Sequence, residues 1–394
     1  MSNREVVVVS GVRTAIGDYG GALKDFAATR LGSTAIKEAV ARAKVDPASV
    51  GHVVMGSVIH GEARDMYLSR VAAVDAGLPV GTPCLTVNRL CGSGLQAIVS
   101  AAQHILLGDC DVTVAGGAES MSRAAYFLPS GRWGQRMGDA AIVDAMTGAL
   151  HDPFGHGHMG VTAENIAAKY GFTRDQQDQF SIESHRRAGR AMEEGRFKSQ
   201  IVPIELQTRK GVESFVTDEH VRKDVKMEDL AKLKTVFKKD GTVTAGNASG
   251  INDAGAAVVL MEAQTAKKMN LKILARLVAY AHAGVEPQMM GLGPIPAVKR
   301  AFEKTGLKPS DIDVVESNEA FAVQAMAVTK DLGLDPAKVN PNGGAVALGH
   351  PIAATGAILT VKALYELERT NKRYALVTMC IGGGQGIAAI FERI

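Results

Sequence analysis

Short runs of β-branched residues alternate with longer stretches of helical spacing along most of this chain. The first run, Glu5–Ser10, holds four consecutive valines and predicts a buried strand. Apolar residues from Leu95 to Leu106 recur at i, i+3, i+4 and i+7, which predicts an amphipathic helix that ends at Gly108. Further strands are predicted at His52–Val58, Leu85–Asn88, Asp111–Ala115, Asp253–Glu262, Leu274–Tyr280, Asp313–Glu316, Lys338–Asn340, Tyr374–Met379 and Gly386–Phe391, and further helices at Leu31–Ala43 and Ile358–Leu367. This alternation predicts an α/β fold.

The two ends of the chain repeat one order of elements. Each has a Val-Asn pair (Val87-Asn88 and Val339-Asn340), a loop, a long helix, a buried strand and a glycine cluster. We therefore predict a duplicated α/β unit. The segment 120–246 lacks this alternation and is rich in charge, which indicates an insertion. The predicted domains are residues 1–119 with 247–270, the insertion 120–246, and residues 271–394.

Composition narrows the class of protein. The chain has 394 residues, 43 of them glycine, with only 5% aromatic residues, which suits closely packed backbones in an α/β enzyme. The net charge of +3 is too small to predict a nucleic-acid partner. We find no apolar run near the roughly 18 residues that span a membrane, and no signal peptide, so we expect a cytoplasmic protein. The four cysteines include no CxxC pair, which argues against a disulfide framework or a metal site.

Cys91 has the sequence context of a nucleophile. It lies in NRLCGSGLQAI, between a predicted strand and a predicted helix. The free N–H groups and the dipole at a helix start stabilise a thiolate, so we expect a lowered pKa. Gly92 and Gly94 would leave room for a substrate to approach. Cys84 and Cys110 lack this context, and we predict that they are packing residues.

His350 holds the position in the second half that corresponds to Cys91 in the first. It lies in NGGAVALGHPIAATGA, where glycines and Pro351 predict a turn before a helix. A pseudo-twofold fold would bring the two loops together and pair the thiol with a base. The sequence gives no such context for five other histidines, which we expect to be inert: His52, His60, His104, His185 and His282.

Two further strand ends carry polar groups. Cys380 closes a predicted strand and begins CIGGGQG, whose backbone N–H groups would suit an oxyanion hole. A dinucleotide site is not favoured there, because a strand rather than a helix is predicted to follow. Asn318, in NEAFA, has two interpretations: a helix cap, or a group directed at a water or a carbonyl.

Taken together, the motifs resemble those of the thiolase family, specifically its bacterial biosynthetic type. The motifs are NRLCGSGLQA, GGAESMS, HMGVTAEN, TAGNASGINDAGAA, NEAFA, NGGAVALGHP and CIGGGQG, in this order. The resemblance extends from Val7 to Ile394. It implies a duplicated αβα sandwich of five layers, αβαβα, with an inserted loop domain.

The resemblance also implies a role for each candidate residue. Cys91 would be the acylated nucleophile and His350 the base that activates it. Cys380 would exchange the proton at Cα of a second acyl-CoA. Asn318 would hold a water that forms one oxyanion hole with His350, and the N–H groups of Cys91 and Gly382 would form the other.

Coenzyme A thioesters are the implied substrates, with no metal and no redox cofactor. The residues implied to bind CoA are Leu150, His158, Met159, Arg222, Phe237, Ala248, Ser249, Met290, Ala320 and Phe321. Similar enzymes use the segment that corresponds to Arg123–Gly138 to assemble, which implies a homotetramer, a dimer of dimers. Ala353 replaces the glycine common in the family and would crowd the turn or narrow the acyl pocket.

The implied reaction is a reversible Claisen condensation of two acyl-CoA molecules by a ping-pong route through acyl-Cys91. The alternative is a degradative 3-ketoacyl-CoA thiolase that prefers longer chains. Cys380 argues against a ketoacyl synthase or a hydroxymethylglutaryl-CoA synthase, which lack a second catalytic cysteine there. A non-catalytic scaffold is disfavoured because the catalytic residues are present. An NAD-dependent dehydrogenase is disfavoured because no GxGxxG follows the first strand.

Overall fold

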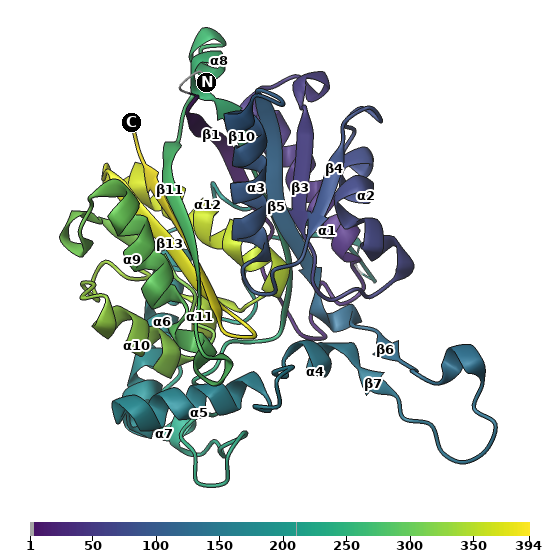
Figure 1. The fold of residues 1–394 in the computed structure, drawn as a ribbon, viewed down its shortest axis with the longest axis vertical. Coiled ribbons are helices and arrows are strands. Elements are labelled where there is room, and N and C mark those ends of the chain that lie inside the picture. Colours follow the sequence, from purple (N-terminus) through teal and green to yellow (C-terminus); the bar gives the residue numbers. More distant parts are fainter. Residues whose placement is uncertain (1–3, 210) are drawn as a thin grey trace.

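The computed structural model describes residues 4–209 and 211–394, and its main feature is a sheet built from two similar halves (Figure 1). The first half has the order β4 (Cys84–Val87), β3 (His52–Gly56), β5 (Val112–Ser120), β10 (Asn252–Glu262), β1 (Val6–Arg13). The second half continues with β11 (Ala275–Gly284), β14 (Gln385–Glu392), β13 (Tyr374–Ile381), β12 (Val314–Ser317). The halves join where Val7 and Val8 of β1 pair with Arg276 and Ala275 of β11. All the predicted strands except Lys338–Asn340 therefore contribute to one sheet.

The duplication extends to strand direction. In the first half β4, β3 and β5 are parallel, while β10 and β1 run antiparallel to their neighbours. In the second half β12 and β13 are parallel, while β14 and β11 run antiparallel. The predicted strand Lys338–Asn340 is wrong, because only one bridge, Val339 to Val315, forms there. Asn340 turns the chain at once with a φ of +46°, so pairing cannot continue.

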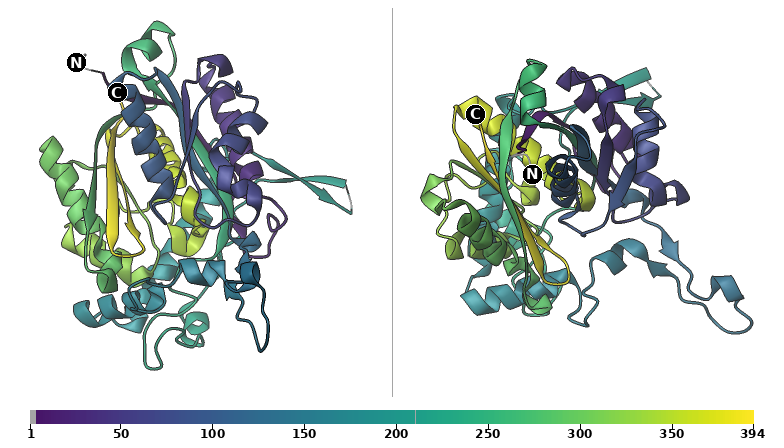
Figure 2. Two further views of the ribbon diagram at one scale, coloured as in Figure 1. Left: turned by 45° about the vertical axis from the view of Figure 1, so that its right-hand side comes forward. Right: turned by 45° about the horizontal axis from the view of Figure 1, so that its top comes forward.

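Helices occupy three layers around the sheet, which gives the predicted five-layer order (Figures 1 and 2). The middle layer is α3 (Ser93–Leu107) and α12 (Ile352–Thr370), and α12 contacts strands of both halves. One outer layer, over the first half, is α1 (Ala28–Ala43) with α2 (Leu68–Asp75). The other, over the second half, is α9 (Pro294–Thr305), beside which lies α10 (Ala322–Asp331).

The middle helix α3 is more apolar than we predicted. The stretch Leu90–Leu107 is long and apolar enough, by length and composition, to cross a membrane. Our prediction that no such stretch exists was therefore wrong. The physical reason is its place in the fold: α3 packs against β3, β5 and α12, so it presents apolar residues on several sides.

Glycines let α3 and α12 cross closely. A Cβ on Gly94 would lie 2.8 Å from the Ala353 carbonyl oxygen, and one on Gly356 would lie 2.2 Å from the Leu95 nitrogen. Gly92 is equally enclosed, because a Cβ there would lie 2.6 Å from Ile381. Gly92 and Gly94 thus serve helix packing, and our prediction that they leave room for a substrate was wrong.

The segment 120–246 forms a separate layer of helices with two projecting arms. Its elements are β6 (Tyr126–Phe127), β7 (Val143–Asp144), α4 (Ala145–Ala149), α5 (Met159–Tyr170), α6 (Arg174–Glu193), β8 (Ile204–Thr208), β9 (Gly211–Phe215) and α7 (Met227–Ala231). The arm that carries β6 and β7 extends away from the body in Figure 1, and the β8–β9 hairpin does so in Figure 2. A fully buried ion pair between Arg13 and Asp218, 2.7 Å long, ties this layer to β1. The remaining strand is β2 (Gly17–Asp18), and the remaining α-helices are α8 (Ala263–Lys268) and α11 (Ala345–Leu348).

Candidate active site

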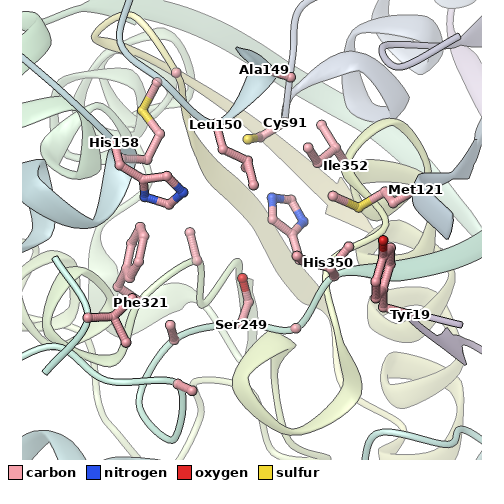
Figure 3. Close-up of a pocket in the computed structure, with 18 of the residues that line it drawn as sticks. Tyr19, Cys91, Met121, Ala149, Leu150, His158, Ser249, Phe321, His350 and Ile352 are labelled. Atoms are coloured by element: carbon pink, nitrogen blue, oxygen red, sulfur yellow. The ribbon is translucent and has the colours of Figure 1, made fainter. Parts of the chain in front are cut away.

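The loops that carry the predicted catalytic residues meet at one cavity of about 480 Å³. Cys91 follows β4, and His350 follows α11. Figure 3 shows the Cys91 thiol and the His350 ring directed into this cavity from different elements. Residues that are far apart in the sequence therefore form one site, as the predicted duplication requires.

Burial controls the ionisation of Cys91. The thiol lies just before α3, and the backbone N–H groups of Gly382 and of Cys91 itself favour its thiolate. Loss of water outweighs both, and Glu119 adds a like charge, so the pKa of Cys91 is raised to about 11. Our expectation of a lowered pKa was therefore wrong. The resting group is therefore a thiol.

The hydrogen bonds of His350 leave its Nε2 as the basic nitrogen. The Thr355 hydroxyl donates to the Pro351 carbonyl at 2.9 Å, so its oxygen accepts from Nδ1 of His350 at 2.6 Å. This bond holds the proton on Nδ1 and leaves Nε2 free to accept one. The backbone N–H of His350 donates to Oδ1 of Asn252 at 2.9 Å, which fixes the loop.

His350 stays neutral over the whole physiological range because burial lowers its pKa to about 4. A base acts only in its neutral form, so kcat/KM is expected to stay level from pH 7 down to pH 5 and to fall as the pH drops through about 4. A pH series with circular dichroism at each point checks this and separates lost chemistry from lost folding. Half-maximal kcat/KM at pH 6.5 in folded protein would contradict it.

Asn318 directly follows β12 and contacts His350. Its Nδ2 lies 3.4 Å from Nε2 of His350, and its Oδ1 has no hydrogen-bond partner within the described residues. The helix-cap interpretation is wrong, because α10 begins only at Ala322 and its N-cap position is Phe321. The unpaired Oδ1 is an acceptor that a water could satisfy, but Asn318 is fully buried and does not line the cavity.

Cys380 lies behind the cavity wall rather than in its lining. It is fully buried near the end of β13, and burial together with the charge of Cys91 raises its pKa above the usual range. That electrostatic interaction puts the two sulfurs in each other's vicinity. Gly382, two positions later, does line the cavity, and a Cβ there would lie 3.1 Å from Leu90 and from Met159.

Gly383 and Gly384 turn the chain from β13 into β14 with φ values of +79° and +86°. The predicted strand after the glycine cluster is confirmed, since Gln385–Glu392 forms β14. The cluster is therefore a hairpin turn beside the cavity and does not open a helix.

All ten residues implied to bind CoA line the cavity. Aromatic rings form one wall: His158 stacks on Phe237 at 4.6 Å, and Phe321 meets Phe237 edge-on. Gly160 is required beneath them, because a Cβ there would lie 2.2 Å from the Phe237 ring. Such a wall suits a slender, largely apolar chain, and Arg222 adds a cation to the lining.

Several groups that fix the position of the site residues were not predicted from the sequence. Thr355 orients His350 and lies five residues after it, so its short spacing could have revealed it. Asn252 and Glu119 act across long sequence separations, and no local signal identifies them. Other lining residues not predicted are Asp18, Tyr19, Leu90, Met121, Ala149, His220, Val236, Ala245, Gly250, Ile251 and Ile352.

The structure also tests the expectations for Ala353 and for His185. Ala353 is fully buried and does not line the cavity, and its N–H donates to Glu119 at 2.9 Å, so it does not narrow an acyl pocket. His185 does not line the cavity, and its Nδ1 accepts from the backbone N–H of Arg222 at 3.1 Å, which is a structural contact. In the part of the chain that the structure describes, no three His, Cys, Asp or Glu side chains gather as a metal site.

Comparison with known proteins agrees with this geometry. The family model "Thiolase, N-terminal domain" matches residues 6–264, and "Thiolase, C-terminal domain" matches residues 271–393. The chain is 66% identical to beta-ketothiolase BktB of Cupriavidus necator, over 99% of this chain and 100% of that protein. It is 48% identical to an acetyl-CoA acetyltransferase of Allochromatium vinosum, over 100% of both chains.

Among solved structures, the acetyl-CoA acetyltransferase of Bacillus anthracis has a TM-score of 0.97 and 45% identity, and 99% of each chain is covered. Human mitochondrial 3-ketoacyl-CoA thiolase also has a TM-score of 0.97, with 44% identity and 99% of each chain covered. The fold and the matches define an acyltransferase enzyme. The chain belongs to the thiolase family.

Proposed function

We propose that this enzyme is an acetyl-CoA C-acetyltransferase, or β-ketothiolase, that condenses two acyl-CoA molecules to a 3-ketoacyl-CoA and CoA, reversibly. The observation that carries the proposal is the shared cavity of Cys91 and His350, with Cys380 behind its wall. The 66% identity to a beta-ketothiolase supports the reaction class. The cavity's wall of His158, Phe237 and Phe321 supports a CoA thioester as the substrate.

In the first half-reaction the acyl group passes to Cys91. Nε2 of His350 takes the thiol proton as the sulfur attacks the thioester carbon. The carbonyl oxygen becomes an oxyanion that accepts hydrogen bonds from the N–H groups of Cys91 and Gly382. The tetrahedral intermediate collapses and the carbon–sulfur bond to CoA breaks. The CoA thiolate takes the proton from His350 and leaves as free CoA.

In the second half-reaction Cys380 passes its own proton to the neutral His350, and the resulting thiolate removes a proton from Cα of a second acyl-CoA. An ionised Cys91 would oppose ionisation of Cys380, and acylated Cys91 cannot ionise, so no charge at position 91 opposes the Cys380 thiolate at this stage. His350 and a water held by Asn318 stabilise the enolate oxygen. The enolate carbon attacks acyl-Cys91, a carbon–carbon bond forms, and Cys91 leaves as a thiolate that takes the proton back from His350.

Chain-length preference separates the proposal from its alternative, a degradative thiolase for longer acyl chains. A bovine mitochondrial 3-ketoacyl-CoA thiolase is 45% identical, a weaker match than the beta-ketothiolase. We expect kcat/KM for thiolysis to be highest with acetoacetyl-CoA and short homologues. Measuring it over a series of 3-ketoacyl-CoA lengths is the test, and a maximum at eight or more carbons would favour the alternative.

We also propose a homotetramer in the cytoplasm, with acyl-CoA and CoA as its only small-molecule partners and no metal or redox cofactor. The β6–β7 arm supports assembly, because it exposes large apolar side chains, among them Phe127, Trp133 and Met137. With a chain of 41.4 kDa, a light-scattering mass near four times that value is expected. A mass of one or two chains would contradict it.

We divide the chain into residues 1–119 with 247–270, the insertion 120–246, and residues 271–394. The start of the C-terminal family match at residue 271 supports the last boundary. In this division Cys91 belongs to the first unit, the insertion supplies His158 and Phe237 to the cavity, and the last unit supplies Asn318, His350 and Cys380.

A further inference from the structure

Glu319, next to Asn318, is a buried carboxylate to which the proposed mechanism gives no role. It is 2% exposed and does not line the catalytic cavity. Its oxygens accept three hydrogen bonds, from Nδ2 of Asn340 at 2.7 Å, from the Ser184 hydroxyl at 2.7 Å and from the Val346 N–H at 3.2 Å. Burial of a carboxylate is costly unless such donors compensate it, so this arrangement is specific.

Each of these partners belongs to, or supports, the loop that leads to His350. Asn340 begins the loop and also pairs with the backbone of Ser317, to which its amide donates at 2.8 Å. Val346 lies in α11, four residues before His350. Ser184, from α6, accepts a hydrogen bond from the Gly344 N–H at 3.0 Å while it donates to Glu319.

The loop lies directly against the carboxylate. A Cβ on Gly344 would be 2.1 to 2.5 Å from the carboxyl carbon and oxygens of Glu319, so only glycine permits this contact. The loop that bears Asn318 and the loop that bears His350 therefore share one buried anchor. The shared anchor matters for function because these loops carry Asn318 and His350, whose Nδ2 and Nε2 atoms are 3.4 Å apart.

We propose that Glu319 is a positioning residue. By joining the two loops, it holds the side chains of Asn318 and His350 at the separation that the reaction requires. The proposal rests on the proposed function, because it assigns Glu319 to the same reaction. Phe321 and Ala320 are fixed independently, since the Ala320 carbonyl accepts from the Ser249 N–H at 3.0 Å and Phe321 bridges to Ala248. Loss of Glu319 is thus expected to disturb the chemistry more than substrate binding.

Glu319→Gln is the first test. A glutamine has one acceptor oxygen and an NH₂ group, so at least one of the donors from Asn340 and Val346 loses its acceptor. We expect kcat for acetoacetyl-CoA thiolysis to fall roughly 10²-fold and KM to change by less than about 3-fold. We also expect the acid limb of kcat/KM to move upward from about pH 4, because a loosened His350 gains contact with water.

Two variants serve as comparison. Ser184→Ala removes one donor and keeps the other two, so a smaller loss of kcat, about 10-fold, is expected. Glu262→Gln is the matched control: Glu262 is also buried and accepts a backbone N–H, from Thr265 at 2.8 Å, but lies at the opposite end of β10 from Asn252. Its kcat and pH profile are expected to match those of the unmodified enzyme.

The outcomes separate the two proposals. If the unmodified enzyme cleaves acetoacetyl-CoA and Glu319→Gln, folded by circular dichroism, keeps kcat within about 2-fold, the positioning role is overturned. An equal loss in Glu262→Gln would also overturn it. If Glu319→Gln does not fold, Ser184→Ala decides in the same way. If the unmodified enzyme has no thiolase activity, the proposed function fails, and the rate of Cys91 alkylation by iodoacetamide still reports the effect of Glu319 on His350.

Discussion

Cys91→Ala is expected to lose the acyl-enzyme completely and to lower kcat by at least roughly 10⁴-fold. The alanine has no sulfur to attack the thioester, and no other described cysteine lines the cavity. Cys380 cannot replace it, since it is fully buried with a raised pKa. Intact-protein mass spectrometry after incubation with acetyl-CoA measures the adduct, which is expected in the unmodified enzyme and absent from the variant.

Cys110→Ala is the matched control for this experiment. Cys110 follows the C-terminal end of α3, whereas Cys91 precedes its N-terminal end, so the helix length separates them by about 20 Å. The control variant is expected to acylate and turn over normally. An acetyl adduct that persists in Cys91→Ala would show that another group is the nucleophile.

Cys380→Ser is expected to acylate at Cys91 but to lose condensation and thiolysis by about 10³-fold. A serine hydroxyl has a far higher pKa than a thiol, and burial at this position raises it further, so it cannot remove the Cα proton. The side chain is nearly the same size, so the fold is expected to persist. Mass spectrometry measures the acetyl adduct, and absorbance of the 3-ketoacyl-CoA enolate measures turnover.

The acetyl adduct and the turnover of Cys380→Ser are informative together, because they report different steps of the reaction. Acylation without turnover separates the acid–base role of Cys380 from the nucleophilic role of Cys91. Normal turnover in Cys380→Ser would remove the proposed proton transfer from the mechanism. Loss of the adduct as well would mean that Cys380 supports Cys91 instead of acting on the second substrate.

Local patterns predicted the elements well where their signal was strong. The valine run became β1, and the periodic apolar residues before Gly108 became α3, which ends there with Gly108 at φ +86°. The pattern failed at Lys338–Asn340, where only Val339 favours a strand and a single bridge forms. A strand needs a partner over several residues, and the turn at Asn340 removes it.

The ionisation of Cys91 was beyond local reasoning. A helix start lowers the pKa of a thiol, and both N–H groups do act in that direction. Their effect is smaller than the cost of removing the thiolate from water, which depends on everything packed around it. The same holds for Gly92 and Gly94, whose missing side chains admit Ile381 and α12 rather than a substrate.

The sequence by itself determined most strands of the large sheet, the family, and many of the residues that line the cavity, among them Cys91, His350 and Gly382. These depend on periodicity, turn residues and short motifs, which are properties of neighbouring positions. Only the tertiary structure decided the protonation of Cys91 and His350, the tautomer set by Thr355, and the anchoring of two loops on Glu319. Those properties arise from burial and from hydrogen bonds between distant segments, and no local pattern encodes either.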